Sequence, residues 1–227
     1  MSSKSQESSD VDDSVGHYVG DAGSIIGDQY EVKSQCGLGT FGKVFLAKDI
    51  KRGDTVALKI IRSIKKYINS AKIEANVLSD IFDKQEKENV HYCVNMYSHF
   101  PFDGFYCLVF EPLGMSLFDF IKKNNYRGFD IPVAKEFSRQ LLSAMSFLHS
   151  HNVVHTDLKL ENILLVNDEL EYVDKQSGRA VSYDAAATSS KRRKTGNLLM
   201  IYICNFHVLN HLLLNFICKL HWNTRFE

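Results

Sequence analysis

The stretch VVHTDLKLENILLV (residues 153–166) constrains the fold and the chemistry of this chain more than any other feature. It gathers His155, Asp157, Lys159 and Asn162 between a run of helical periodicity and a short apolar run typical of a strand. Such a density of polar groups between two regular elements predicts one of two things. Either the loop carries a function, or its charges are solvated and share no target.

A second motif, GLGTFGKV (residues 37–44), has the pattern G-x-G-x-x-G-x-V and lies between two predicted strands. Gly37, Gly39 and Gly42 have no Cβ, so the backbone N–H groups of this loop can approach the phosphates of a nucleotide. The same spacing occurs in dinucleotide-binding folds and in plain hairpins with turn glycines. A dinucleotide fold needs a helix after the loop, and the strand-like run found here disfavours it.

Lys59, inside the apolar run TVALKII (residues 55–61), is the third feature. A lysine within an apolar strand needs a partner for its charge. The segment INSAKIEANVLSDIF (residues 68–82) reads as a helix and offers Glu74. One interpretation is that Lys59 contacts the α- and β-phosphates and pairs with Glu74. The alternative is a solvent-facing lysine and an unrelated surface carboxylate, but the glycine loop upstream favours the first.

Taken together, the three motifs predict phosphoryl transfer. Asp157 is placed to accept or orient the proton of a substrate hydroxyl, and Lys159 can stabilise the moving phosphoryl group. Asn162 can hold a Mg²⁺ ion. The fixed order of these groups behind a glycine loop and a strand lysine disfavours the alternative of loop charges without a common target.

These residues together resemble the eukaryotic protein kinases over roughly residues 29–166, about the first half of a kinase domain. Most kinases have Arg where this chain has Thr156. Four segments are similar to the LAMMER (CDC-like) kinases: HTDLK, GHYV (16–19), GTFGKV and LVFEPLGMSLFDFI (108–121). The segment HTDLK is also similar to the related SR-protein kinases. An Arg can pair with a phosphorylated activation loop and a Thr cannot, so the resemblance implies independence from that switch.

The resemblance implies ATP and Mg²⁺ as cofactors and the phosphorylation of Ser, Thr and sometimes Tyr in proteins, typically Arg/Ser-rich splicing factors. It implies a location in the nucleus or the cytoplasm. It also implies a nucleotide site formed by a gatekeeper, two hinge residues, a residue near the ribose and two residues on the adenine ring. Phe110 would be the gatekeeper, and Glu111 and Leu113 would be the hinge residues. Asp119 would lie near the ribose, and Val44 and Ala57 would lie on the adenine ring.

The chain departs from the family pattern in several places. Leu160 stands where the family has Pro, and Leu38 where its glycine loop has Glu. No Asp-Phe-Gly follows the loop at 155–162, and FDG at 102–104 precedes it. That Asp is the main Mg²⁺ ligand of kinases. A second hypothesis is therefore a catalytically inactive, truncated fragment that only binds nucleotide or partners.

The sequence changes in character after residue 167, and residues 175–227 fit no kinase element. One hypothesis is that residues 175–227 are read from an unspliced intron or come from a wrong gene model. Residues 198–222 are long and apolar enough for a membrane segment, but their Asn and His side chains are costly in hydrocarbon. KRRK (191–194) predicts either a nuclear-import patch or a solvated loop. Residues 1–15 are polar and acidic, which predicts disorder and no secretory signal.

Composition limits the classes of partner. The 27 basic and 27 acidic residues cancel, so we expect no direct contact with nucleic acid and none with a membrane. Five scattered cysteines predict reduced thiols and no disulfide framework.

The predicted fold is α+β: a kinase-like N-lobe with an antiparallel five-stranded sheet and one helix, then a partial helical C-lobe. Its predicted divisions are 1–15, 16–29, 30–113, 114–166 and 167–227.

Overall fold

The computed structural model describes residues 15–126, 129 and 131–166, with three short strands at 171–173, 180–182 and 201–203. The predictions for residues 1–14, for KRRK and for most of 167–227 lie outside the described residues. The chain divides into two compact units. The first holds the residues up to Lys72 together with Tyr97–Phe110, and the second holds Ile73–Met96 together with the residues from Glu111 onward.

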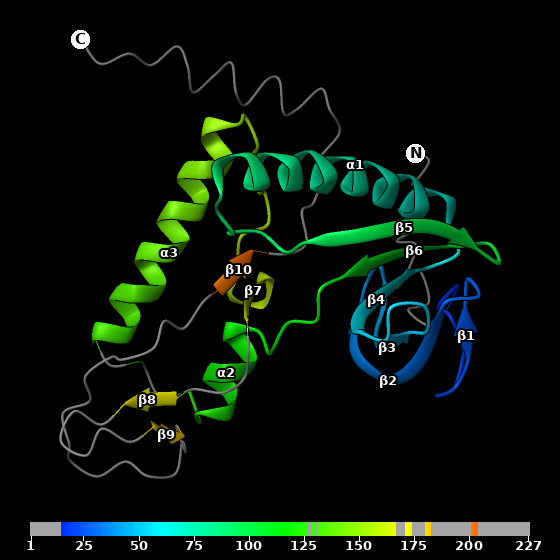
Figure 1. Ribbon diagram of the computed structural model, residues 1–227, viewed down its shortest axis with the longest axis horizontal. Coiled ribbons are helices and arrows are strands. Elements are labelled where there is room, and N and C mark those ends of the chain that lie inside the picture. The colour runs from blue at the N-terminus through cyan, green and yellow to red at the C-terminus, as the bar shows by residue number, and fades with distance from the viewer. Residues whose placement is uncertain are drawn as a thin grey trace, which may run out of the picture. The chain divides into compact units, whose positions relative to one another are not determined.

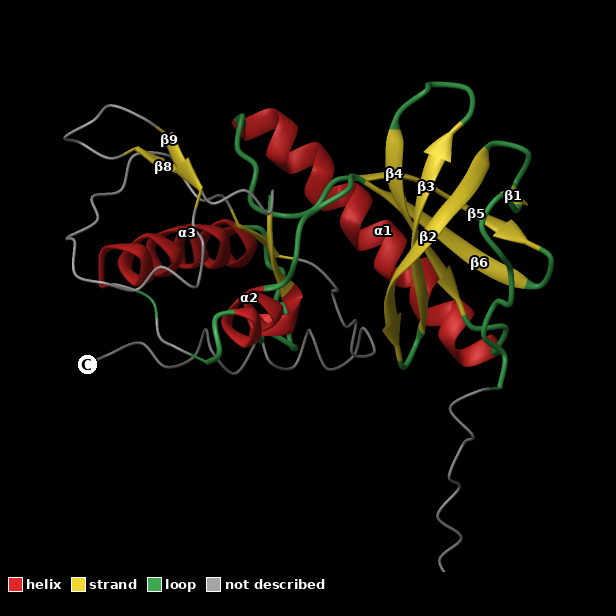
Figure 2. Cartoon of the chain, turned by 90° about the horizontal axis from the view of Figure 1, so that it is seen from below, coloured by secondary structure: helices red, strands yellow, loops and turns green. Residues whose placement is uncertain are grey.

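The first unit is built on a six-stranded sheet in the order β1-β2-β3-β4-β6-β5 (Figure 1 and Figure 2). The strands are β1 (Ile25–Ile26), β2 (Tyr30–Gly39), β3 (Gly42–Asp49), β4 (Thr55–Ile61), β5 (Met96–Phe102) and β6 (Phe105–Phe110). The pairs β1–β2, β2–β3, β3–β4 and β4–β6 are antiparallel. Five of these strands match the predicted five-stranded sheet, and β1 is the addition.

The extra strand β1 is a two-residue arm that folds back on β2. Ile25 pairs with Glu31 and Ile26 with Tyr30 across a turn in which Gly27 and Asp28 both have positive φ, as in the turns that suit hairpins. Ile26 is only 1% exposed and belongs to the core. Two residues are too few to show a periodicity of two, which is why the sequence pattern did not reveal this strand.

The core of the first unit lies on one face of the sheet. Successive side chains of a strand point to opposite faces, so Val56, Leu58 and Ile60 of β4 are buried while Ala57 and Lys59 turn to the other face. Aromatic residues of β5, β6 and the N-terminal segment pack at the edge of this core. The buried cluster consists of Ile26, Tyr30, Val32, Phe45, Ala47, Val56, Leu58, Ile60, Cys107 and Val109.

Helix α1 (Lys65–Glu88) is longer than the predicted helix over 68–82, and its buried face differs. The predicted stripe was Ile73, Val77 and Ile81, but Ile73 is 39% exposed. A spacing of four overshoots the helical repeat by about 40° at each step, so the stripe drifts off one face. The buried residues are separated by steps of four, three, three and four: Ala71, Ala75, Leu78, Ile81 and Gln85.

The second unit contains α2 (Leu117–Lys123), α3 (Ile131–Ser150), the 3₁₀ turn η1 (Leu160–Asn162) and β7 (Ile163–Leu165). Its short strands pair as β7 with β10 (Ile201–Ile203) and β8 (Glu171–Val173) with β9 (Ala180–Ser182), both antiparallel. Leu117, Phe120, Phe137, Ile163 and Leu165 form its core cluster. Among the described residues, no helix has the length and apolar character needed to cross a membrane.

Helix α3 follows the prediction of an amphipathic helix over 133–152 with small shifts at both ends. Of its predicted stripe, Phe137 and Leu148 are buried, whereas Leu141 and Met145 are half-buried. The buried set is completed by Ala144 and Phe147, which the predicted stripe did not include. The helix thus packs along a wider face than the predicted stripe.

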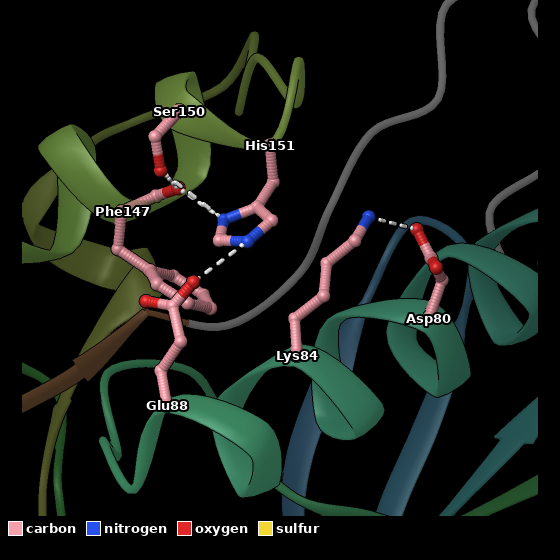
Figure 3. A network of polar contacts seen from close by, with 6 residues as sticks. All are labelled: Asp80, Lys84, Glu88, Phe147, Ser150 and His151. Carbon is pink, nitrogen blue, oxygen red and sulfur yellow. Dashed lines mark hydrogen bonds and ion pairs between the residues drawn. The ribbon is translucent and has the colours of Figure 1, made fainter.

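The C-terminal ends of α1 and α3 are joined within the second unit by His151 (Figure 3). Its Nε2 lies 3.0 Å from Oε1 of Glu88, and its Nδ1 lies 2.9 Å from the carbonyl oxygen of Phe147. The imidazole ring thereby bridges the last turn of α3 and the end of α1. The ring also packs against Phe147 at an interplanar angle of 51°, and Phe147 contacts Tyr92.

Burial separates the three cysteines in the described part of the chain. Cys93 and Cys107 are fully buried, and burial raises the pKa of each thiol to about 12, whereas Cys36 is exposed. The thiolate is the reactive form, so at pH 8 only about 10⁻⁴ of a thiol with that pKa can react. We expect iodoacetamide to modify Cys36 before Cys93 and Cys107 in the native protein, as read from peptide masses. Equal labelling rates for Cys36 and Cys93 would contradict the described packing.

Candidate active site

The glycine loop is the connection between β2 and β3. Gly39 pairs with Gly42, and Gly37 pairs with Val44 beside a register shift in β2. A Cβ on Gly42 would collide with the carbonyl group of Ile60, so the sheet itself requires glycine there. A Cβ on Gly37 or Gly39 would meet only ordinary contacts, at 3.4 and 3.9 Å. The sheet does not demand these two glycines, which is consistent with their predicted role of admitting a ligand.

Three further predicted site residues share the sheet face opposite the core. Val44 of β3 lies directly across from Lys59 of β4, and Ala57 lies two residues before Lys59 on the same strand. All three are half-buried, whereas Phe45 and Leu58, which point the other way, are buried. The first unit therefore places the lysine and the two predicted adenine contacts together on one surface.

Glu74, the predicted partner of Lys59, lies on α1 in the second unit and is half-buried. Lys59 belongs to the first unit. Their ion pair remains a prediction.

The catalytic-loop residues predicted from the sequence lie together in the second unit. Nζ of Lys159 is 3.1 Å from Oδ2 of Asp157. Nδ2 of Asn162 donates to the same carboxylate oxygen at 2.9 Å and to the carbonyl oxygen of Asp157 at 2.8 Å. Asn162 is only 4% exposed, so the amide is held in place while the Lys159 side chain, 49% exposed, reaches the carboxylate from solvent.

A tight turn places Asp157. The N–H of Asp157 donates to the carbonyl oxygen of His155 at 2.5 Å, and Thr156 between them has φ of 51°. This i to i+2 bond is a γ-turn, and a β-branched residue at positive φ is strained. His155, 1% exposed, anchors the start of the turn. Strain of this kind is typical of functional loops, where the surrounding structure holds it.

The predicted hinge is tied to the rest of the second unit on both sides. Glu111 donates its N–H to the carbonyl oxygen of Asn95 at 3.1 Å, and its Oε1 accepts from the N–H of Asn95 at 2.7 Å. Further on, Gly114 donates to the carbonyl oxygen of Leu165, and Leu165 donates to that of Met115. The chain that follows half-buried Leu113 is thereby attached to β7, the strand that leaves the catalytic loop.

The half-buried carboxyl of Glu111 gives a pH-dependent stability. Burial raises its pKa above 4.5, and the N–H of Asn95 opposes that shift only in part. A raised folded pKa means that the native state holds its proton more tightly, so this contribution is complete below pH 4.5 and is lost as pH rises through the folded pKa. We expect Glu111→Gln to unfold at higher urea than the parent at pH 7 and at equal urea near pH 4. The reverse order would contradict this assignment.

Asp119 is fixed by a helix cap that the sequence analysis missed. Ser116 is the N-cap of α2: its Oγ accepts from the N–H of Asp119 at 3.0 Å and lies 2.7 Å from Oδ2 of Asp119. Asp119 is itself exposed at the first turn. The signal was present, since Ser followed three residues later by an acidic residue ahead of an apolar run is a helix-start signature.

Comparison with known proteins finds similar protein kinases. The protein kinase domain model matches residues 30–191. The mouse dual specificity protein kinase CLK2 is 44% identical over 161 residues, which are 70% of this chain and 32% of that protein. The Arabidopsis thaliana serine/threonine-protein kinase AFC2 is 40% identical over 183 residues, 79% of this chain and 42% of that protein. The chain therefore spans less than half the length of these relatives.

A solved crystal structure of a kinase domain is similar to this chain, with a TM-score of 0.68 and 32% sequence identity. The match covers 85% of this chain and 54% of the chain in that crystal structure. The kinase model covers well over half of the sequence and includes the glycine loop, Lys59 and the Asp157 loop. This chain belongs to the protein kinase family, and its relatives place it in the LAMMER, or CDC-like, group.

Proposed function

We propose that this chain is the ATP-binding and catalytic-loop part of a LAMMER-type protein kinase that transfers the γ-phosphoryl group of ATP to Ser and Thr hydroxyls and, by dual specificity, to Tyr. The observation that carries this proposal is the contact of Lys159 and Asn162 with one oxygen of Asp157, at 3.1 and 2.9 Å. Phosphoryl transfer needs a carboxylate for the hydroxyl, a cation for the phosphoryl group and an oxygen ligand for Mg²⁺ in one place.

Each group has one role in this proposal. Asp157 orients the substrate hydroxyl and receives its proton, and Lys159 neutralises charge on the transferred group. On the first unit, Gly37, Gly39 and Gly42 give the phosphates access to backbone N–H groups, and Lys59 binds the α- and β-phosphates, with Glu74 as its partner. Val44, Ala57, the hinge at Glu111 and Leu113, and Asp119 bind adenosine.

The amide of Asn162 fits a role toward Mg²⁺. Its Nδ2 is committed to Asp157, which fixes the direction of its amide oxygen, and Mg²⁺ prefers such hard oxygen ligands. Within the described residues, no group of three or more His, Cys, Asp or Glu side chains could hold a metal ion. Phosphate oxygens and water would complete the coordination shell. A bound Mg²⁺ would neutralise charge on the phosphates.

The substrates that we propose are Arg/Ser-rich proteins such as splicing factors, in the nucleus, the cytoplasm or both. The support is the HTDLK wording with Thr156 and the similarity to the dual specificity kinase CLK2.

A second candidate function is binding of nucleotide or of a partner without phosphoryl transfer. It is favoured by one sequence observation: no Asp-Phe-Gly occurs between Asn162 and Glu227. Kinases use that Asp as a Mg²⁺ ligand.

A phosphotransfer assay distinguishes the two. Purified 1–227, Mg-ATP and an Arg/Ser-repeat peptide are incubated with Asp157→Asn as the matched blank, and ATP affinity is titrated in parallel. Transfer that is lost in the blank supports the kinase proposal. ATP binding without transfer supports the second candidate. A folded chain that does neither would contradict both.

A further inference from the structure

A buried arginine behind the glycine loop links it to the chain N-terminal to the sheet. Arg62 follows β4 and is 1% exposed. Its Nε donates to the carbonyl oxygen of Val15 at 2.8 Å, and its Nη1 donates to that of Thr40 at 3.2 Å. Its guanidinium also lies over the ring of Tyr67, 5.6 Å from the centroid. A buried cation is stable only when its donors are satisfied, so these contacts fix it.

Arg62 holds both residues of the loop tip, Thr40–Phe41. The side chain binds the carbonyl oxygen of Thr40, and the backbone N–H of Arg62 donates to the carbonyl oxygen of Phe41 at 2.9 Å. The ring of Phe41 packs edge-on against Tyr67, with centroids 5.2 Å apart. One residue therefore fixes the orientation of two consecutive peptide groups at the tip of the glycine loop.

The orientation of these two peptides matters for an anion. In a planar trans peptide the C=O and N–H point in opposite directions, and the described chain has no cis peptide. Directing the carbonyls of Thr40 and Phe41 toward Arg62 directs the N–H groups of Phe41 and Gly42 away from them. Phosphates bind N–H groups and are repelled by carbonyl oxygens.

The other end of this link is the N-terminal segment, Val15–Tyr18. Gly16, at φ of 77°, accepts from the N–H of Ser63 at 2.8 Å, and the carbonyl oxygen of Tyr18 accepts from Nζ of Lys43 at 3.0 Å. The Tyr18 ring packs edge-on against Phe45 and Phe105. The segment is thus bound along β3 and the end of β4, and the carbonyl oxygen of its Val15 accepts from the Arg62 side chain.

We propose that Arg62 is a positioning residue for nucleotide phosphates, which keeps the loop tip in its phosphate-accepting orientation while the N-terminal segment is docked. This inference rests on the proposed nucleotide-binding function. It adds that residues outside the sheet control the affinity for phosphates through one buried guanidinium. Loss of either the guanidinium or the docking produces the same defect at the loop tip.

The test compares ATP with adenosine, which binds the same site without phosphates. Arg62→Met, which keeps the stem and removes every donor, is expected to weaken ATP binding about tenfold and to leave adenosine binding unchanged. Arg62→Lys replaces the planar guanidinium by a single ammonium group. Its affinity for ATP is expected to lie between that of the parent and that of Arg62→Met. A merely structural role would weaken both ligands equally.

Two glycines at positive φ supply a matched pair of variants. In Gly16→Ala the new Cβ meets Ile64 only at ordinary contact distance, but the residue is strained at φ of 77°, and this strain is expected to loosen the docked N-terminal segment. Gly53→Ala is equally strained at φ of 83° but meets nothing within 4 Å, in the turn between β3 and β4. We expect Gly16→Ala to reproduce the ATP-specific loss, without adding to that of Arg62→Met, and Gly53→Ala to leave the ATP-to-adenosine ratio unchanged.

Hydrogen exchange of the peptide covering Gly37–Val44 reads the same coupling without nucleotide. Faster exchange in Arg62→Met and Gly16→Ala, but not in Gly53→Ala, supports the inference. This support holds even if the parent chain fails to bind ATP, because that failure overturns the proposed function alone. An unchanged ATP-to-adenosine ratio together with unchanged exchange in folded Arg62→Met and Arg62→Lys would overturn the inference and leave the proposed function in place.

Discussion

Replacing Asp157 by Asn is expected to lower the rate of phosphotransfer by about 10²–10⁴-fold, the range typical of a lost general base, with little change in ATP affinity. Asn has the shape of Asp, and its amide oxygen can still accept from Lys159 and Asn162, which contact Oδ2 at 3.1 and 2.9 Å. What it loses is the negative charge and the capacity to take the substrate proton. Single-turnover rates with labelled ATP measure the first effect, and ATP titration measures the second.

The control for that loss is another Asp→Asn change at a solvent-exposed ion pair. Asp54, in the turn before β4, is 61% exposed at its side chain and lies 3.4 Å from Nε of Arg52. Exposed pairs of this kind contribute at most about 1 kcal/mol, so Asp54→Asn is expected to transfer phosphate at the parental rate. If Asp157→Asn kept a tenth or more of the parental rate, another group would have to be the base.

The parts of the site that the sequence predicts best are those whose residues are close in the chain. Asp157, Lys159 and Asn162 lie within one turn and a 3₁₀ segment, so local geometry alone brings their side chains together. β4 has the bounds of the run TVALKII, because its alternation sets the buried face without help from distant residues. The predicted α+β fold with a kinase-like sheet and helix is also confirmed, and that prediction came from the resemblance of the motifs to the protein kinases.

The features that the sequence did not predict depend on contacts between distant residues or on polar helical segments. α1 continues to Glu88 through DKQEKE, which has no apolar period and yet favours a helix by propensity. Arg62 meets Val15 and Thr40 only in the folded sheet, and nothing in a single arginine after a strand marks it as buried. Patterns of one segment cannot show which backbone carbonyls a remote side chain will reach.

Gln85 is a residue of this second kind, and replacing it by Ala is expected to destabilise the protein by about 3–5 kcal/mol. Its side chain is 1% exposed at the end of α1. Oε1 accepts from the N–H groups of Tyr92 and Cys93 at 2.7 and 2.6 Å, and Nε2 donates to the carbonyl oxygen of Cys93 at 3.1 Å. Alanine leaves these groups without a partner and opens a cavity. Urea unfolding measures the loss, with exposed Glu86→Ala as the matched control.

A second substitution at Gln85 separates the lost hydrogen bonds from the lost packing. Leu fills a similar volume but accepts nothing, so the N–H groups of Tyr92 and Cys93 stay unsatisfied. If hydrogen bonding dominates, Gln85→Leu is expected to be as unstable as Gln85→Ala. Recovery of most of the stability in Gln85→Leu would instead assign the effect to packing. Because Asn95, two residues beyond Cys93, binds the hinge residue Glu111, loss of these bonds is also expected to loosen the hinge. Faster hydrogen exchange at Glu111 in both variants would show that loosening, and unchanged exchange there would contradict it.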